Sequence, residues 1–318
     1  MIKIGFFTDL HARNDTPEKR TDNFRESLLI KLHEVGEIFK REKVDLILFG
    51  GDLGHTPDPS YSLTNAILKE LKSWDKTIVG VIGSHDYFGY QKRTIDRTMM
   101  GTMVAADVIT LVDEDTGFIY GSPIEGTVII TGNVHQYDST DHIERLDLKY
   151  FNPDALLQIQ LVHCDLYYKQ VPWPHILIQD VKTQSDLVLS GHIHSGWMTP
   201  MTIGSTTFYN PGSIARLEKS KERRIPRVSI IEIAGKKDYS IRDFMLTTAL
   251  EHPFRDDVEE FEAEENTSQD ISKLLDFIET TSIEVTDVKQ LLKEFAQREN
   301  YSTEIIEVVF ELLEKAKN

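Results

Sequence analysis

Five short clusters of residues that can bind divalent metal ions stand at the ends of apolar segments. They are Thr8-Asp9-Leu10-His11, Gly50-Gly51-Asp52, Gly83-Ser84-His85-Asp86, Val162-His163 and Gly191-His192-Ile193-His194. Carboxylates and imidazoles without thiolates suit Mn, Fe, Zn or a similar divalent ion, and a central carboxylate such as Asp52 can bridge two ions about 3.5–4 Å apart. A single Asp-x-His or Gly-Asp is more often a turn. Five clusters that hold five of the eleven histidines favour a metal centre.

The segments between the first clusters carry the patterns of strands and helices. Residues 2–8, 46–49 and 78–82 are predicted to be buried strands, and apolar residues at helical spacing predict helices at 24–39 and 66–74. This alternation implies parallel strands joined by right-handed crossovers. Ligands of such sheets lie outside the carboxyl ends of the strands, so the clusters are expected to converge at one edge.

The middle of the chain is expected to add strands separated by loops, with more antiparallel pairing. The predicted strands cover residues 118–120, 128–130, 159–162, 187–189, 202–209 and 228–233. We therefore expect an α/β domain over residues 1–250.

The last fifth of the chain differs in charge from the rest. Residues 251–318 hold 19 acidic and 7 basic side chains, so that −12 of the net charge of −17 lies there. This pattern predicts an acidic linker at 251–269 and a small helical module at 270–318 with three amphipathic stripes. The stripes could pack against the protein itself or against a partner, and both alternatives stay open here.

Composition excludes several classes of protein. With 40% hydrophobic and 27% charged residues, the 318-residue chain is expected to be globular rather than disordered. No apolar run approaches the roughly 20 residues of a membrane span, so no membrane association is expected. The start of the chain lacks a signal-peptide pattern, and the single cysteine, Cys164, excludes an intramolecular disulfide. A cytoplasmic location is therefore expected.

The five clusters, in this order, resemble the motifs of the calcineurin-like metallophosphoesterase superfamily over residues 1 to about 245. The resemblance implies a two-sheet α/β sandwich flanked by helices and a centre of two divalent metal ions, with Mn(II) as the expected metal. It implies that the first ion is held by Asp9, His11, Asp52 and His194. The second ion would be held by Asp52, His163 and His192, with Ser84 at the position where the family has Asn.

Ser84 is the largest departure from the family pattern. Its hydroxyl lies closer to its own backbone than an asparagine amide oxygen would, so it would reach a metal only through an inward shift of the loop or through a water molecule. We therefore predict that the second metal is bound more weakly than the first.

Three further residues are candidates for catalysis rather than for metal binding. The resemblance makes His85 the candidate general acid or transition-state donor, and an unperturbed imidazole pKa of about 6.5 suits either role. Asp86 is expected to orient a histidine. His55 could stabilise the phosphate or position a nucleic-acid strand, or it could be an ordinary loop histidine.

A basic cluster follows the turn Asn210-Pro211-Gly212-Ser213. Its members are Arg216, Lys219, Lys221, Arg223, Arg224 and Arg227. They could contact phosphate beside the site, or they could form a solvated loop.

Within the superfamily, Gly50-Gly51-Asp52-Leu53-x-His55 followed by Pro59-Ser60 resembles the SbcD-type DNA repair exonucleases. Gly54 stands where an aromatic residue is usual there, and Asp58 where a polar or basic residue is often found. The likeness implies a metal-dependent DNA nuclease in which a hydroxide activated by two metals attacks the phosphodiester. It further implies a repair or recombination complex, in which the C-terminal helices bind an SbcC-type coiled-coil ATPase, and a homodimer. The alternatives are a small-molecule phosphodiesterase or phosphatase, and a catalytically weakened binding scaffold.

Overall fold

The structure is a computed structural model, and it describes part of the chain. The described residues are 1–122, 124, 126–133, 145–146, 152–171, 175–217, 224–249 and 253–254. All of them belong to Met1–Val258, the first of the two units into which the chain divides. The acidic linker predicted at 251–269, apart from 253–254, and the helical module predicted at 270–318 lie outside the described residues.

Two six-stranded sheets form the framework of this unit. The first has the strand order β16-β15-β1-β2-β3-β4. Its strands are β1 (Ile2–Phe7), β2 (Leu46–Phe49), β3 (Ile78–Gly80), β4 (Ile109–Leu111), β15 (Arg227–Gly235) and β16 (Asp238–Met245). The neighbours from β1 to β4 are parallel, whereas β15 pairs antiparallel with both β1 and β16.

The second sheet has the order β13-β14-β12-β8-β6-β5. Its strands are β5 (Phe118–Ser122), β6 (Gly126–Asn133), β8 (Leu157–His163), β12 (Leu187–Gly191), β13 (Met201–Ile203) and β14 (Thr206–Tyr209). Two short pairs stand apart from it, and they join β9 (Leu166–Tyr167) with β10 (Ile176–Leu177) and β7 (Arg145–Leu146) with β11 (Lys182–Thr183).

The side chains of β1 point alternately to the two faces of the first sheet, so the sheet contributes to two apolar layers. Ile4 and Phe6 point into the core between the two sheets, where they meet residues of the second sheet such as Leu161. Phe7 points to the opposite face and packs with Phe39 of the first helix. Successive strand side chains point to opposite faces, so this sheet buries both of its faces, as parallel sheets do.

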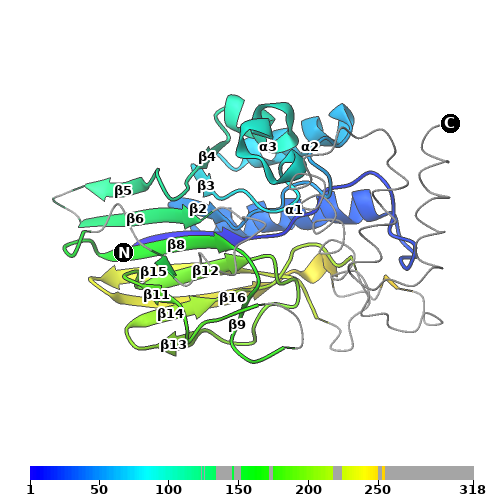
Figure 1. Cartoon of the computed structure of the whole chain (residues 1–318). Coiled ribbons are helices and arrows are strands. Elements are labelled where there is room, and N and C mark those ends of the chain that lie inside the picture. Colours follow the sequence, from blue (N-terminus) through cyan, green and yellow to red (C-terminus); the bar gives the residue numbers. More distant parts are fainter. Residues whose placement is uncertain are drawn as a thin grey trace, which may run out of the picture. The chain divides into compact units, whose positions relative to one another are not determined.

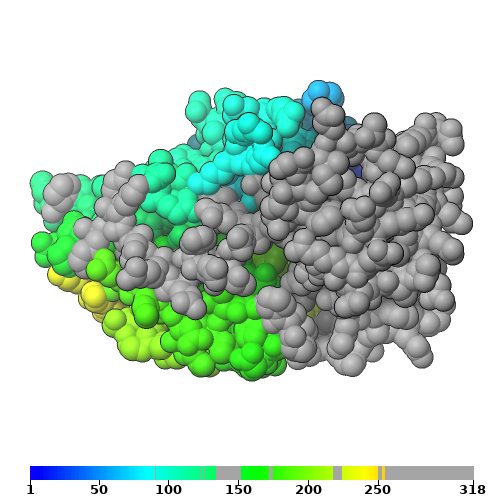
Figure 2. Space-filling view, viewed as in Figure 1, coloured from blue at the N-terminus to red at the C-terminus, as the bar shows by residue number. Residues whose placement is uncertain are grey.

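Helices cover the outer face of the first sheet. They are α1 (Phe24–Glu42), α2 (Tyr61–Ser73) and α3 (Met99–Ala105), and short 3-10 helices occupy Phe88–Tyr90, Lys92–Arg97 and Thr247–Ala249. Figure 1 shows α1, α2 and α3 on the side of β2, β3 and β4, with the yellow helix Thr247–Ala249 below α1. Figure 2 shows the same division on the surface, with the cyan region around α3 opposite the green strands of the second sheet.

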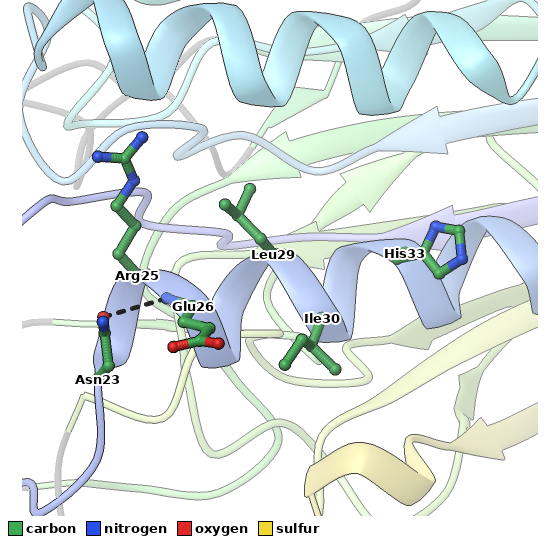
Figure 3. Close-up of a pocket in the computed structure, with 6 residues that line it drawn as sticks. All are labelled: Asn23, Arg25, Glu26, Leu29, Ile30 and His33. Atoms are coloured by element: carbon green, nitrogen blue, oxygen red, sulfur yellow. Dashed lines mark hydrogen bonds between the residues drawn. The ribbon is translucent and has the colours of Figure 1, made fainter.

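The helix starts are set by local hydrogen bonds. The Asn23 side chain accepts from the backbone N–H of Glu26 at 3.2 Å at the start of α1 (Figure 3), and Ser60 accepts from Leu63 at the start of α2. Such caps satisfy backbone donors that have no partner within the helix. At the other end of α1, Lys43 adopts the left-handed conformation that commonly ends a helix.

The predicted fold class is confirmed as an α/β sandwich of two sheets with flanking helices. The expected increase in antiparallel pairing is found at β5, β13, β15 and β16. The central strands of the second sheet, β6, β8, β12 and β14, differ from it because they run parallel. All seven residues of β8 are buried, and burial on both faces is typical of parallel strands.

The segment expected to be one strand over 202–209 is two strands. A turn at Gly204 and Ser205, in which Gly204 has a φ of 60°, separates β13 from β14. Within the described ranges, no helix has the length and apolar character that crossing a membrane requires.

Candidate metal centre

The five clusters leave the carboxyl ends of five parallel strands, as the sequence predicts. Asp9 follows β1, Asp52 follows β2 and Ser84 follows β3, and these three strands are neighbours in the first sheet. His163 ends β8 and His192 follows β12, and these two strands are neighbours in the second sheet. The centre therefore lies where the same ends of both sheets meet.

The backbone at the predicted ligands is held in an uncommon conformation. Asp9, His11, Asp52 and His192 have φ values of 54°, 44°, 58° and 75°. Residues other than glycine seldom have positive φ, and they keep it where the surrounding structure enforces it. Here the enforcement comes from backbone bonds between the two loops, in which Asp9 N donates to Gly51 O and His11 N donates to Asp52 O, both at 3.0 Å.

A first group of ligand atoms comes from Asp9, His11 and His194, and these atoms lie within 4.8 Å of one another. His11 Nε2 and His194 Nε2 are 2.8 Å apart. Asp9 Oδ1 lies 3.8 Å from His11 Nε2 and 3.7 Å from His194 Nε2. His11 Nε2 also lies 3.5 Å from Asp52 Oδ2.

A second group comes from Asp52, His163 and His192, again within 4.8 Å. His163 Nε2 lies 3.1 Å from Asp52 Oδ2. His163 Nδ1 donates to the Gly50 carbonyl at 2.7 Å, which fixes the ring so that Nε2 faces the site. Asp52 Oδ2 is thus near His11 of the first group and His163 of the second, which is the place of a bridging carboxylate.

The buried charges perturb the pKa values of these groups. Burial would raise the pKa of Asp52, but the charges of His163, His85 and His11 hold it well below its usual range. Burial would lower the pKa of His163, yet the charge of Asp52 and its hydrogen bond raise it to about 10. Burial and the neighbouring His11 lower the pKa of His194 to about 3.

The donor set fits divalent cations. Asp9 is 0% exposed and Asp52 is 1% exposed, and among the described residues neither forms an ion pair with lysine or arginine. Buried carboxylates need a compensating positive charge. Imidazole and carboxylate ligands suit Mn, Fe or Zn, so two cations between these groups would supply that charge.

The loop after β3 wraps around the Asp52 carboxylate. Ser84 Oγ donates to Asp52 Oδ2 at 3.3 Å, and the backbone N–H of His85 donates to Asp52 Oδ1 at 2.8 Å. Gly83 lies so close that a Cβ there would be 2.2 Å from Asp52 Oδ1. A side chain at position 83 would collide with Asp52, which explains why this cluster begins with glycine.

His85 and His55 lie beside the first group. Their rings stack with centroids 5.3 Å apart and planes at 18°, and His85 Nδ1 lies 2.8 Å from the His55 carbonyl oxygen. A carbonyl only accepts, so His85 Nδ1 is the donor and Nε2 is the atom left for a substrate. Burial lowers the pKa of both rings, that of His55 to about 3. His55 therefore belongs to the site rather than to a remote loop.

Asp86 contacts backbone, whereas the sequence predicts that it orients a histidine. Its carboxylate accepts from the N–H groups of Asp52, Leu53 and Gly83 at 2.8–2.9 Å. Burial and the charge of Asp52 raise the pKa of Asp86 to about 7. Asp86 thus ties the loop after β3 to the loop after β2.

Two described members of the basic cluster, Arg224 and Arg227, bind the turn that precedes them. Arg224 donates to the Ser213 carbonyl at 2.7 Å, and Arg227 donates to the Pro211 carbonyl at 3.2 Å. Lys219, Lys221 and Arg223 lie outside the described residues. Arg224 and Arg227 therefore stabilise the turn next to His194, and the expected phosphate contact stays a prediction.

Two polar residues of the site were not predicted. Asp165 Oδ1 lies 3.4 Å from His192 Nε2, and Arg13 Nη1 lies 3.1 Å from His55 Nε2. Each comes two residues after a predicted ligand, His163 or His11. The same spacing of two that pairs Asp9 with His11 could have indicated both.

A surface depression lies elsewhere, along α1. Its described lining includes Leu29, Ile30 and His33 (Figure 3), and its volume is about 570 Å³. His33 Nδ1 lies 3.1 Å from Glu70 Oε1 of α2, so His33 joins two helices. This depression holds no part of the candidate metal centre.

Comparison with known proteins places the chain in a family. The family described as calcineurin-like phosphoesterase matches residues 2–196. No curated protein sequence matches the chain.

Solved structures with a similar fold include three from different organisms. A putative 5'-nucleotidase from Staphylococcus aureus is 10% identical, with a TM-score of 0.48, and the match covers 86% of this chain and 58% of that one. The calcineurin-like phosphoesterase YfkN from Bacillus subtilis is 14% identical, with a TM-score of 0.47, and the match covers 77% of this chain and 90% of that one. A dimetal phosphatase from Danio rerio is 10% identical, with a TM-score of 0.45, and the match covers 77% of this chain and 99% of that one. This chain thus spans less than two thirds of the Staphylococcus aureus protein.

The family match covers more than half of the chain and contains all five clusters. The chain belongs to the calcineurin-like phosphoesterase family.

Proposed function

We propose that the protein is a metal-dependent phosphodiesterase that acts on DNA, the nuclease subunit of an SbcCD-like complex. The observation that carries the hydrolytic part is the convergence of two groups of ligand atoms on a shared carboxylate, Asp52. The preference for DNA rests on the resemblance of residues 50–60 to the SbcD-type nucleases.

The proposed ligands divide into two sets around Asp52. Asp9, His11 and His194 would hold one cation with it, and His163 and His192 would hold the other. Two divalent cations, when bound, supply the positive charge that polarises a phosphoester and lowers the pKa of a water molecule. Mn(II) is the metal we propose for both positions.

His85, held in place by His55, would transfer the proton to the leaving group. With Nδ1 of His85 bound to the His55 carbonyl, Nε2 is the atom that can hold a proton near the leaving sugar oxygen. His55 keeps this ring in place through that carbonyl and through the ring stack. Ser84 contributes a hydrogen bond to Asp52.

Access to the site is compatible with a polymer. The side chain of His194 is 40% exposed and that of His192 is 26% exposed, so the candidate ligands are reachable from solvent. A nucleotide-type small phosphoester would also reach them, and this is the second candidate substrate class.

One assay separates the candidate functions. The full chain is incubated with Mn(II) and either single- or double-stranded DNA or bis(p-nitrophenyl) phosphate. Cleavage of DNA that is lost in Asp52→Asn supports the nuclease. Turnover of the small ester alone indicates the second candidate, and no turnover of either substrate indicates a binding scaffold and refutes the proposal.

The proposed partners concern the part of the chain that the structure does not describe. We propose that residues 270–318 bind an SbcC-type coiled-coil ATPase and that the protein forms a homodimer. The support is the amphipathic pattern of these residues and the likeness to SbcD-type nucleases. A cytoplasmic location is proposed because the chain has a single cysteine, Cys164, as is usual in a reducing compartment.

A further inference from the structure

Arg13 lies at the rim of the metal centre and makes an uncommon contact. Its Nη1 lies 3.1 Å from His55 Nε2, and its Nη2 pairs with the Asp15 carboxylate. A guanidinium has donors only and does not lose its proton in proteins. His55 Nε2 must therefore accept, and the proton of the neutral ring sits on Nδ1.

A chain of contacts leads from Arg13 to the proposed proton carrier. The His55 ring that Arg13 holds is stacked on His85, and the His55 carbonyl accepts from His85 Nδ1 at 2.8 Å. Both rings are fixed, so His85 Nε2 is held in one orientation. Asp15 in turn holds the guanidinium of Arg13.

We propose that Arg13 is a positioning residue for phosphoester hydrolysis, fixing the tautomer and plane of His55 and thereby the orientation of His85. The inference rests on the proposed function, because it takes His85 as the residue that exchanges a proton with the substrate. Outer residues that orient the groups around a metal centre typically contribute 10- to 100-fold to activity.

The positive charge of Arg13 argues against a third metal ion at His11, His55 and His85. Nitrogen atoms of His11, His55 and His85 lie within 4.8 Å of one another and resemble a third metal site. The guanidinium of Arg13 is in contact with one of these rings. A cation among them would face that fixed positive charge at close range, so positioning explains the cluster better than a third metal does.

The kinetic test compares Arg13→Met and Arg13→Lys with wild type, using bis(p-nitrophenyl) phosphate and Mn(II). We expect Arg13→Met to lower kcat about 10- to 100-fold with KM nearly unchanged. Arg13→Lys should recover part of kcat, since an ammonium can also donate to His55 Nε2. Arg25→Met is the matched control, because Arg25 donates to Ser62 at 2.8 Å and to Asn14 at 3.4 Å and has no hydrogen bond to a histidine among the described residues. Its kcat should equal that of wild type.

A second measurement reports the tautomer directly. Two-bond ¹H–¹⁵N correlation spectra of the full chain loaded with diamagnetic Mg(II) should show His55 protonated at Nδ1 in wild type. In Arg13→Met the proton should move to Nε2 or exchange between the two nitrogens. This readout does not depend on activity.

The outcomes are distinguishable. An unchanged kcat in Arg13→Met, or an unchanged His55 tautomer, would overturn the inference while leaving the proposed function intact. A rise in KM without a fall in kcat would also overturn it, since Arg13 would then bind the substrate itself. Wild-type protein that hydrolyses neither substrate refutes the proposed function, and the spectra then still decide whether Arg13 sets the tautomer.

Discussion

The Ser84 hydroxyl donates to Oδ2 of Asp52 at 3.3 Å, the carboxylate oxygen that also faces His163 Nε2 at 3.1 Å and His11 Nε2 at 3.5 Å. The hydroxyl therefore reaches the carboxylate proposed to bridge the two metals. An asparagine at this position would bring an amide oxygen farther into the site.

The first prediction concerns this position and the second metal. Wild-type protein should bind one Mn(II) tightly and a second more weakly, because Ser84 replaces an amide ligand. Ser84→Asn should tighten the weaker site by about 10-fold, or about 1.4 kcal/mol. Isothermal titration of metal-free protein measures both constants. Ser84→Ala is the control, with little change expected, and two equally tight sites in wild type would contradict the prediction.

Asp52→Asn should abolish activity without unfolding the protein. Removing the shared negative charge weakens both groups of ligands at once, so the rate with Mn(II) should fall on the order of 10³-fold. The control is Asp75→Asn, another aspartate with positive φ but exposed and outside the site. Initial rates with circular dichroism as a folding check test the pair. A rate in Asp52→Asn close to that of Asp75→Asn would remove Asp52 from the mechanism.

Asp86→Ala should lower both stability and metal affinity. The change leaves the backbone N–H groups of Asp52, Leu53 and Gly83 without the carboxylate that they now bind. A buried donor left unsatisfied costs about 1–3 kcal/mol, so a loss on the order of 3 kcal/mol in the free energy of unfolding is expected.

The measurement is urea denaturation of wild type, Asp86→Ala and a matched control. Asp113→Ala also removes a carboxylate that accepts backbone N–H groups, but it does so in an exposed turn, where a change within about 0.5 kcal/mol is expected. Equal losses in the two variants would show that Asp86 holds no special position.

Lys31 should make the stability of the protein depend on pH. Its side chain is 3% exposed and donates to the Ile214 carbonyl, and burial with nearby arginines lowers its pKa to about 7. Between pH 7 and the ordinary lysine pKa, the unfolded chain holds one more proton than the folded protein. The free energy of unfolding therefore rises with pH over this range, by about 1.4 kcal/mol per pH unit from this group.

Lys31→Met removes this contribution. The free energy of unfolding of the variant should exceed that of wild type by the largest amount at pH 7, and this difference should shrink steadily toward pH 9. Urea denaturation at several pH values measures the difference, with the exposed Lys40→Met as control. A difference between Lys31→Met and wild type that does not vary with pH would be inconsistent with a neutral buried lysine.

Deletion of residues 266–318 tests the proposed partner. We expect the shortened protein to lose binding to an SbcC-type ATPase while it keeps hydrolysis that depends on Mn(II), because the candidate metal centre lies in residues 9–194. Pull-down with the ATPase and the small-ester assay measure the two properties. Retained ATPase binding would refute the C-terminal site.

The sequence alone determined which residues gather at the candidate metal centre. Apolar runs followed by Asp9, Asp52, His163 or His192 predict strands whose ends carry ligands, because buried strands and their loops have a local signature in hydrophobicity and glycine. The first two helices and the gathering of all five clusters follow from this signature and from the geometry of parallel sheets, although the second helix begins at Tyr61 rather than at residue 66. The two-sheet sandwich was implied by the family resemblance.

Only the tertiary structure decided how the residues around the ligands act. Three features depend on loops and strands far apart in the chain: Asp86 binds three backbone N–H groups, Arg13 faces His55, and the central strands of the second sheet run parallel. Whether such a hydrogen bond forms depends on differences of a few tenths of an ångström in the distance between two segments, and these segments share no local sequence pattern. A side chain's type and spacing limit what it can bind, whereas its partner is fixed by packing.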